Sequence, residues 1–168
     1  CDVRPPTALA VQQGLDLAEH ARQALDASGA QVVLLARAGQ DLSRYGLQWS
    51  HVGWAYRSAE GWRVVHKLNT CGTAVASVYR QGLGQFFLDD PFDYRAAFIA
   101  PPLAWQQALA PVLADDGRAA AVHVRPYSMV AFAWGQRYQQ SNQWAAETLG
   151  WAVQGGVPSR AEIGRAHV

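Results

Sequence analysis

The chain has 168 residues, of which half are hydrophobic and 16% are charged, and its formal net charge is +1. This length suffices for one domain with a hydrophobic core, and the high apolar content, with seven tryptophans, argues against intrinsic disorder. The near-zero charge argues against a nucleic-acid partner, and no apolar stretch approaches the roughly 18 residues that cross a bilayer.

The two ends of the chain differ from the rest. The sequence begins at Cys1 without a methionine, which suggests that upstream residues, such as an export signal, have been removed or were never read. At the other end, "EIGRAHV" reads like a translated sequencing-adapter oligonucleotide. We therefore expect a single globular domain over residues 1–160 and a non-native tail over residues 161–168.

The spacing of apolar residues predicts several helices and strands. Two strands with a turn between them form an expected β-hairpin, and residues 117–126 fit either a short helix or a strand. In chain order, the predicted elements are a helix over 7–30, strands over 31–37, 48–56 and 62–69, helices over 70–87 and 101–114, a strand over 127–134 and a helix over 141–153. This order predicts an α+β fold, an antiparallel sheet flanked by helices.

Two histidines lie on the predicted hairpin, almost symmetrically about its turn. His51 and His66 should therefore be near cross-strand neighbours on one face. One imidazole could then orient the other, as a general base requires, although a histidine in a strand is more often a satisfied core residue. Gly53 shares the face of His51, and we expect it to leave room for a substrate or another backbone.

The hairpin "SHVGWAYRSAEGWRVVHKL" resembles the His-x-Gly strand and following strand of the circularly permuted papain-like hydrolases, a group that includes NlpC-type peptidases and lecithin retinol acyltransferase. The resemblance implies a similar fold, with His51 as the base and His66 as its orienting residue. It also implies a nucleophile at the start of a late helix. Here "YQQSNQWAA" carries Ser141 where the family has a cysteine, and Gln143 replaces an acidic residue. Ser141 could equally be the N-cap of its helix.

Several other residues are candidates for a site. Asp41, in the loop before the His51 strand, could line a substrate pocket together with Gly53, Asn142 and Gln143. No paired metal-ligand spacing is present, and we expect neither a metal nor a cofactor.

The two cysteines permit a disulfide, a contribution to a metal site or two independent thiols. Cys71 follows a predicted strand and precedes a predicted helix, a position that lowers a thiol pKa, with His66 or His123 as a possible neighbour. Cys71 is therefore the alternative nucleophile.

Over most of its length the chain also resembles DUF 2145, a bacterial domain family of unknown function. The matching strings include "ARAGQDLSRYGLQWSHVGW", "GLGQFFLDDPFDYRAAFI" and "RYQQSNQW". Such proteins are generally predicted to be exported, which implies a periplasmic or secreted location and favours a disulfide between Cys1 and Cys71.

These observations lead to three functional hypotheses. The first is an exported hydrolase or acyltransferase that acts on amide or ester bonds of the cell envelope, with a small-molecule or peptidoglycan-like substrate. The second is a catalytically silent envelope protein that keeps the fold for binding or structure. The third is a thiol enzyme that depends on Cys71. The sequence does not define the oligomeric state.

Overall fold

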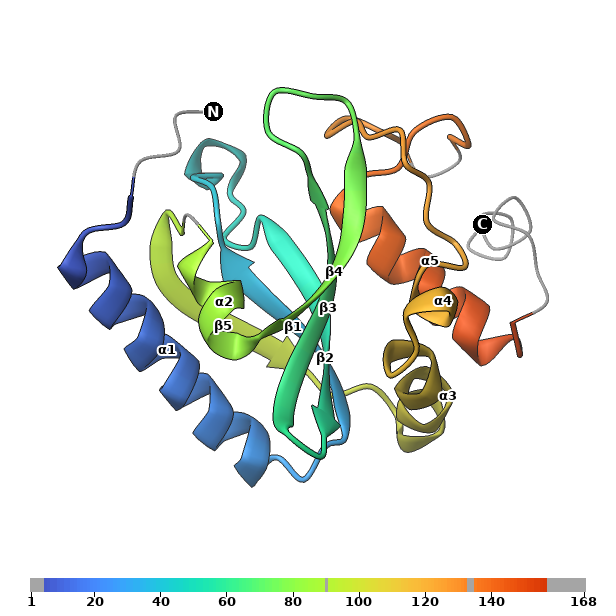
Figure 1. Cartoon of the computed structure of the whole chain (residues 1–168), viewed down its shortest axis with the longest axis horizontal. Coiled ribbons are helices and arrows are strands. Elements are labelled where there is room, and N and C mark those ends of the chain that lie inside the picture. The colour runs from blue at the N-terminus through green and yellow to red at the C-terminus, as the bar shows by residue number, and fades with distance from the viewer. Residues whose placement is uncertain (1–4, 90, 133–134, 157–168) are drawn as a thin grey trace.

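A computed structural model describes residues 5–89, 91–132 and 135–156 of the chain. The first helix is followed by most of the strands, and the last three regular elements are helices (Figure 1). They are α1 (Ala8–Ala27), β1 (Val32–Ala38), the 3-10 turn η1 (Ser43–Tyr45), β2 (His51–Ser58), β3 (Gly61–Asn69), β4 (Ala76–Gly82), α2 (Leu83–Leu88), β5 (Asp93–Ile99), α3 (Leu103–Leu113), α4 (Asp116–Ala119) and α5 (Ser141–Val153).

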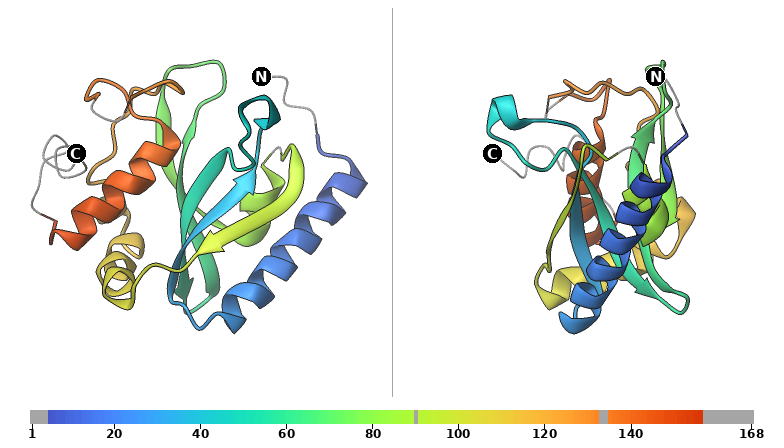
Figure 2. Two further views of the ribbon diagram at one scale, coloured as in Figure 1. Left: turned by 180° about the vertical axis from the view of Figure 1, so that it is seen from behind. Right: turned by 90° about the vertical axis from the view of Figure 1, so that its left-hand side faces the viewer.

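The five strands form one sheet in the order β4-β3-β2-β1-β5, and every neighbouring pair is antiparallel. Helices cover both faces of this sheet, α1 and α2 on one side and α3 and α5 on the other (Figures 1 and 2). The predicted α+β class and antiparallel sheet are confirmed. No described helix is long and apolar enough to cross a membrane.

Side chains that alternate along each strand build two separate cores, because successive residues of a strand point to opposite faces. In β1, Val33 and Leu35 pack with α1 and α2, whereas Val32 packs with α3 and α5. We call the first side the α1 face and the second the α5 face. The site described below lies on the α1 face.

The helix predicted over residues 70–87 is wrong. Residues 70–75 contain a turn, the middle of the segment is the strand β4, which pairs with β3 from Asn69↔Ala76 to Arg63↔Gly82, and only Leu83–Leu88 forms the helix α2. The apolar residues of this segment fit a helical period and a two-residue period equally well over such a short length. Pairing with the neighbouring strand decides between the two.

The strand predicted over residues 127–134 is also wrong. Its described part, 127–132, contains no strand and exposes Met129, Val130 and Phe132, while residues 133 and 134 lie outside the described part. The sheet is instead completed by β5, which the sequence analysis did not predict and which pairs with β1. Aromatic alternation alone cannot make a strand without a partner to accept its backbone hydrogen bonds.

Candidate functional site

The two histidines of the hairpin meet on the α1 face. His51 Nε2 lies 2.8 Å from His66 Nδ1, and the two rings are arranged edge to face with centroids 5.1 Å apart. His66 is completely buried and His51 is 9% exposed. The β2–β3 register pairs Trp54 with Val65, and its continuation places His66 beside Gly53. The rings therefore meet diagonally rather than directly across the hairpin.

Of the two neighbours expected beside Gly53, a substrate or another backbone, the structure places the neighbouring strand β3 there. A Cβ atom at this position would lie 2.7 Å from Val64 Cγ1, 3.0 Å from His66 Cβ and 3.2 Å from the Val65 carbonyl oxygen. The neighbouring strand β3 thus occupies the space beside the glycine. This close approach brings the His66 ring near enough to reach His51.

The hydrogen-bonded chain continues to a residue that the sequence analysis missed. His66 Nε2 lies 2.8 Å from Gln81 Oε1 on β4, so three neighbouring strands each contribute one residue. His51, His66 and Gln81 follow one another at intervals of 15 residues. Recognising Gln81 requires knowing that residues 76–82 form a strand, because a helix would have placed its side chain elsewhere.

A buried arginine, also missed from the sequence, stands beside the histidines. Arg37 on β1 is the direct cross-strand partner of His51. Its guanidinium lies 4.8 Å from the centre of the Phe86 ring, donates a hydrogen bond to the Phe86 carbonyl and pairs with Asp89 at 2.5 Å. The Phe86 ring in turn lies 5.1 Å from the His66 ring and 5.9 Å from the His51 ring.

This environment keeps both imidazoles neutral at pH 7. Burial, followed by the charge of Arg37 and the neighbouring His66, holds the pKa of His51 well below its usual value of 6.5. Burial lowers the pKa of His66 to about 4, although the hydrogen bond that His66 donates to Gln81 opposes the shift. A neutral imidazole has one nitrogen that can accept a proton. In His51 the nitrogen that forms no hydrogen bond among the described residues is Nδ1.

Ser141 is the first residue of α5, and Gln140 occupies the N-cap position. The serine hydroxyl is therefore not the helix N-cap, contrary to the alternative raised from the sequence. Ser141 is buried, and α5 packs on the α5 face, opposite to the two imidazoles. Within the described residues no hydrogen bond joins Ser141 to His51 or His66.

The first turn of α5 is nevertheless attached to the start of β2. Asn142 Oδ1 accepts a hydrogen bond from the backbone N–H of Val52, the residue after His51, at 3.2 Å. The next residue, Gln143, donates to Glu147 within the helix at 2.9 Å. Asp41 is exposed and accepts a hydrogen bond from the Ser43 N–H at the start of η1. The Asn142 contact therefore links α5 to β2 beside His51, whereas the contacts of Gln143 and Asp41 described above are local to their own segments.

Cys71 is disulfide-bonded, and its predicted pairing with Cys1 involves a residue outside the described part of the chain. The strand β4, not a helix, follows Cys71. The helix dipole that was expected to lower its thiol pKa is therefore absent at this position. Among the described residues, no three His, Cys, Asp or Glu side chains form a group that could hold a metal ion.

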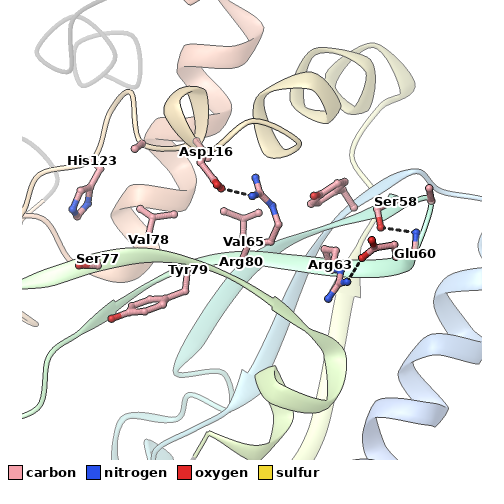
Figure 3. A pocket seen from close by; sticks show the side chains of 14 residues that line it. Ser58, Glu60, Arg63, Val65, Ser77, Val78, Tyr79, Arg80, Asp116 and His123 are labelled. Atoms are coloured by element: carbon pink, nitrogen blue, oxygen red, sulfur yellow. Dashed lines mark hydrogen bonds and ion pairs between the residues drawn. The ribbon is translucent and has the colours of Figure 1, made fainter.

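A groove lies on the α5 face, away from the histidine pair (Figure 3). It is bounded by β3 and β4 on one side and by α4 and His123 on the other. Its two arginines already have acidic partners, Asp116 for Arg80 and Glu60 for Arg63. The groove and the histidine pair are therefore separate features of the molecule.

Comparison with known proteins identifies a family but no activity. No curated protein and no solved structure matches the chain, so these comparisons give no support to a relationship with papain-like hydrolases. One family model, DUF2145, described as an uncharacterized protein conserved in bacteria, matches residues 24–167. The match extends into residues 161–167, which lie outside the described part and whose non-native origin stays a prediction. Because the match spans most of the chain, this protein belongs to the bacterial DUF2145 family.

Proposed function

We propose that this protein is an exported hydrolase or acyltransferase that acts on amide or ester bonds of the cell envelope, with His51 as its general base. The observation that carries the proposal is the chain from His51 through His66 to Gln81. It fixes the His51 ring through Nε2 and leaves Nδ1 for a reacting group. An imidazole held by a second polar group is the arrangement that general-base catalysis requires.

The nucleophile in this proposal is the hydroxyl of Ser141. His51 Nδ1 takes the hydroxyl proton as the serine oxygen bonds to the substrate carbonyl carbon, and the imidazolium returns that proton to the leaving amine or alcohol. Water or an acceptor alcohol or amine then attacks the acyl-serine, again losing its proton to His51. His51 then returns this proton to the serine oxygen as the acyl–oxygen bond breaks, which restores Ser141 and the neutral imidazole and forms either the free acid or the transferred acyl product.

Two observations support the choice of Ser141. Its hydroxyl is not used as the helix cap, and the Asn142–Val52 hydrogen bond attaches the first turn of α5 next to His51 in the chain. Catalysis requires Ser141 Oγ to come within about 3 Å of His51 Nδ1 in the substrate complex, because proton transfer takes place at hydrogen-bond distance. In the structure α5 packs on the α5 face, whereas the His51 ring lies beside Phe86 on the α1 face, so catalysis requires the start of α5 to approach His51.

The proposed location is the periplasm or the cell exterior. A disulfide at Cys71 supports it, since disulfides persist in oxidising compartments. The same disulfide makes the third hypothesis, a Cys71-dependent thiol enzyme, conditional on reduction. Thiol titration with and without reductant tests that hypothesis, and a thiol that stays unreactive after reduction eliminates it.

A fluorophosphonate probe, which forms a covalent bond with activated serines, tests the first proposal. We expect labelling of the parent protein, at least a hundredfold less labelling of Ser141→Ala and His51→Gln, and unchanged labelling of the control Ser128→Ala. Equal labelling of the parent and Ser141→Ala rules out this serine. Undiminished labelling of His51→Gln rules out His51 as the general base.

The groove on the α5 face favours the second hypothesis, a protein that binds an envelope component without catalysis (Figure 3). Co-sedimentation with purified peptidoglycan tests it. Ala120 is exposed and lines the groove, so Ala120→Trp should fill the groove without disturbing the core. Loss of co-sedimentation in Ala120→Trp but not in Ser141→Ala, together with an unlabelled parent protein, would favour binding over catalysis.

A further inference from the structure

We propose that Gln81 determines which nitrogen of His51 carries the proton, and that it thereby acts as a positioning residue for the general base. The positioning role rests on the proposed function, because only a general base needs its lone pair kept free. The arrangement of protons itself can be measured without any activity.

The amide oxygen of Gln81 can only accept a hydrogen bond, and this fixes which atom donates at each step of the chain. Since this oxygen faces His66 Nε2 at 2.8 Å, Nε2 must carry a hydrogen. A neutral imidazole has one N–H, so His66 Nδ1 has none and accepts from His51 Nε2 at 2.8 Å. His51 Nδ1 then keeps its lone pair.

The reverse arrangement would disable the base. If the Gln81 amide presented its NH₂ group to His66, the His66 proton would move to Nδ1 and would be donated to His51 Nε2. The single proton of His51 would then lie on Nδ1, the nitrogen that has to accept a proton from the nucleophile. The orientation of one amide therefore decides the protonation of a ring two hydrogen bonds away.

A neutral partner suits this role better than a carboxylate. His66 can accept from His51 and donate to Gln81 only while it is neutral, because an imidazolium donates from both nitrogens. A carboxylate at position 81 would favour the imidazolium form of His66, whereas burial and the nearby Arg37 charge disfavour it. Glutamine accepts the same hydrogen bond without adding a charge.

Nitrogen NMR of ¹⁵N-histidine-labelled protein at pH 8 tests the inference, because protonated and unprotonated ring nitrogens resonate far apart. We expect His51 and His66 both to carry their proton on Nε2, with assignments from His51→Gln and His66→Gln. Gln81→Met is similar in shape but cannot accept a hydrogen bond from nitrogen as an amide does, and it should give a mixture of tautomers at both rings. Gln85→Met, which removes a glutamine that bonds to the Gly82 N–H, should leave both rings unchanged.

Gln81→Glu provides a rescue. At pH 9 its carboxylate accepts from a neutral His66, so both rings should return to the parent tautomer. A parent His66 with its proton on Nδ1, or unchanged tautomers in Gln81→Met, overturns the inference.

Labelling with the fluorophosphonate probe separates this inference from the proposed function. The probe should label Gln81→Met at least tenfold more slowly than the parent. At pH 9 it should label Gln81→Glu at about the rate of the parent. If the tautomers follow the expectation but the parent never labels, the proposed function fails and the role of Gln81 in setting the protons stands. If the parent labels while His51 carries its proton on Nδ1, the inference alone fails.

Discussion

The two faces of the central sheet each bury a polar network, and the two networks end differently. On the α1 face, neutral side chains run from Gln81 through His66 to His51. On the α5 face, Lys67 is completely buried and donates to the Val124 carbonyl at 2.6 Å and to Gln139 Oε1 at 2.7 Å.

The network on the α5 face joins charged groups through an amide. Gln139 donates to Glu147 and also to the Val122 carbonyl at 2.9 Å, so one glutamine links a buried cation to a buried carboxylate. These bonds attach Val122, Val124 and Gln139, which lie outside regular helices and strands, to β3 and α5. The network on the α1 face instead ends at a nitrogen of His51 without a hydrogen-bond partner among the described residues. We infer that the network on the α5 face stabilises the fold, whereas the network on the α1 face holds the proposed general base.

Replacing the buried cation should have the largest effect on stability. Lys67→Met removes the donor of the Val124 carbonyl and one of the two donors of Gln139 Oε1, whose other donor is the Val124 N–H at 3.0 Å. Because these groups lie in the buried interior beside the removed charge, we expect a loss of about 3–5 kcal/mol in the free energy of unfolding. Urea denaturation measures it. Arg95→Met, which removes the exposed pair with Asp93, should cost less than about 1 kcal/mol and is the matched control. Similar losses in both variants would contradict the structural role of Lys67.

The α1 face should make stability depend on pH. In the unfolded chain the histidines bind protons near pH 6.5, whereas the folded protein keeps His66 neutral down to about pH 4 and shifts His51 in the same direction. The unfolded state therefore binds more protons between these values, so the free energy of unfolding is highest above pH 6.5 and falls as the pH drops towards 4. For His66 alone the loss is about 3 kcal/mol.

Urea titrations from pH 4 to pH 8 measure this dependence. The double variant His51→Gln/His66→Gln should give a much flatter profile over the same range, whereas His20→Gln, on the exposed side of α1, should follow the parent. A parent whose stability does not change between pH 6.5 and pH 4.5 would show that the two histidines titrate normally in the folded state.

The sequence was sufficient to predict those helices and strands whose pattern of apolar and turn residues is local. The amphipathic helix α1, the hairpin of β2 and β3 and the helix α5 follow from apolar spacing and turn residues, and the hairpin alone brings His51 and His66 together. The strands β4 and β5 could not be predicted in this way, because each exists by pairing with a strand distant in sequence. Local propensity is a weak guide when tertiary pairing decides.

The same distinction explains which site residues were missed. Gln81 belongs to β4, and Arg37 joins the site because β1 pairs with β2 across the loop that contains η1. Neither residue has a sequence motif of its own. The sequence could not decide whether a substrate or another backbone lies beside Gly53 for a related reason, since only the observed register shows that β3 fills this space.

Gly53→Ala tests whether that close approach holds the histidines together. The added methyl group would lie 2.7 Å from Val64 and 3.0 Å from His66 Cβ, so β2 and β3 must separate. We expect a loss of about 1–3 kcal/mol and a disturbed His51–His66 hydrogen bond, seen as altered ring-nitrogen signals. Gly82→Ala is the control, because the nearest atom to its Cβ would be 3.8 Å away. Equal stability of both variants would mean that the strands can adjust without strain.

The smallest expected effect distinguishes the two roles considered for Ser141. Thr7 is a true N-cap whose hydroxyl accepts from the Ala10 N–H at 3.1 Å, so Thr7→Ala should cost about 1 kcal/mol of stability. Ser141 lies one position inside α5, and its hydroxyl makes no capping bond, so Ser141→Ala should cost less than about 0.5 kcal/mol. Urea denaturation of the two variants gives the comparison. A loss in Ser141→Ala that equals the loss in Thr7→Ala would assign the serine to helix stability, whereas a nearly unchanged stability with abolished probe labelling would assign it to catalysis.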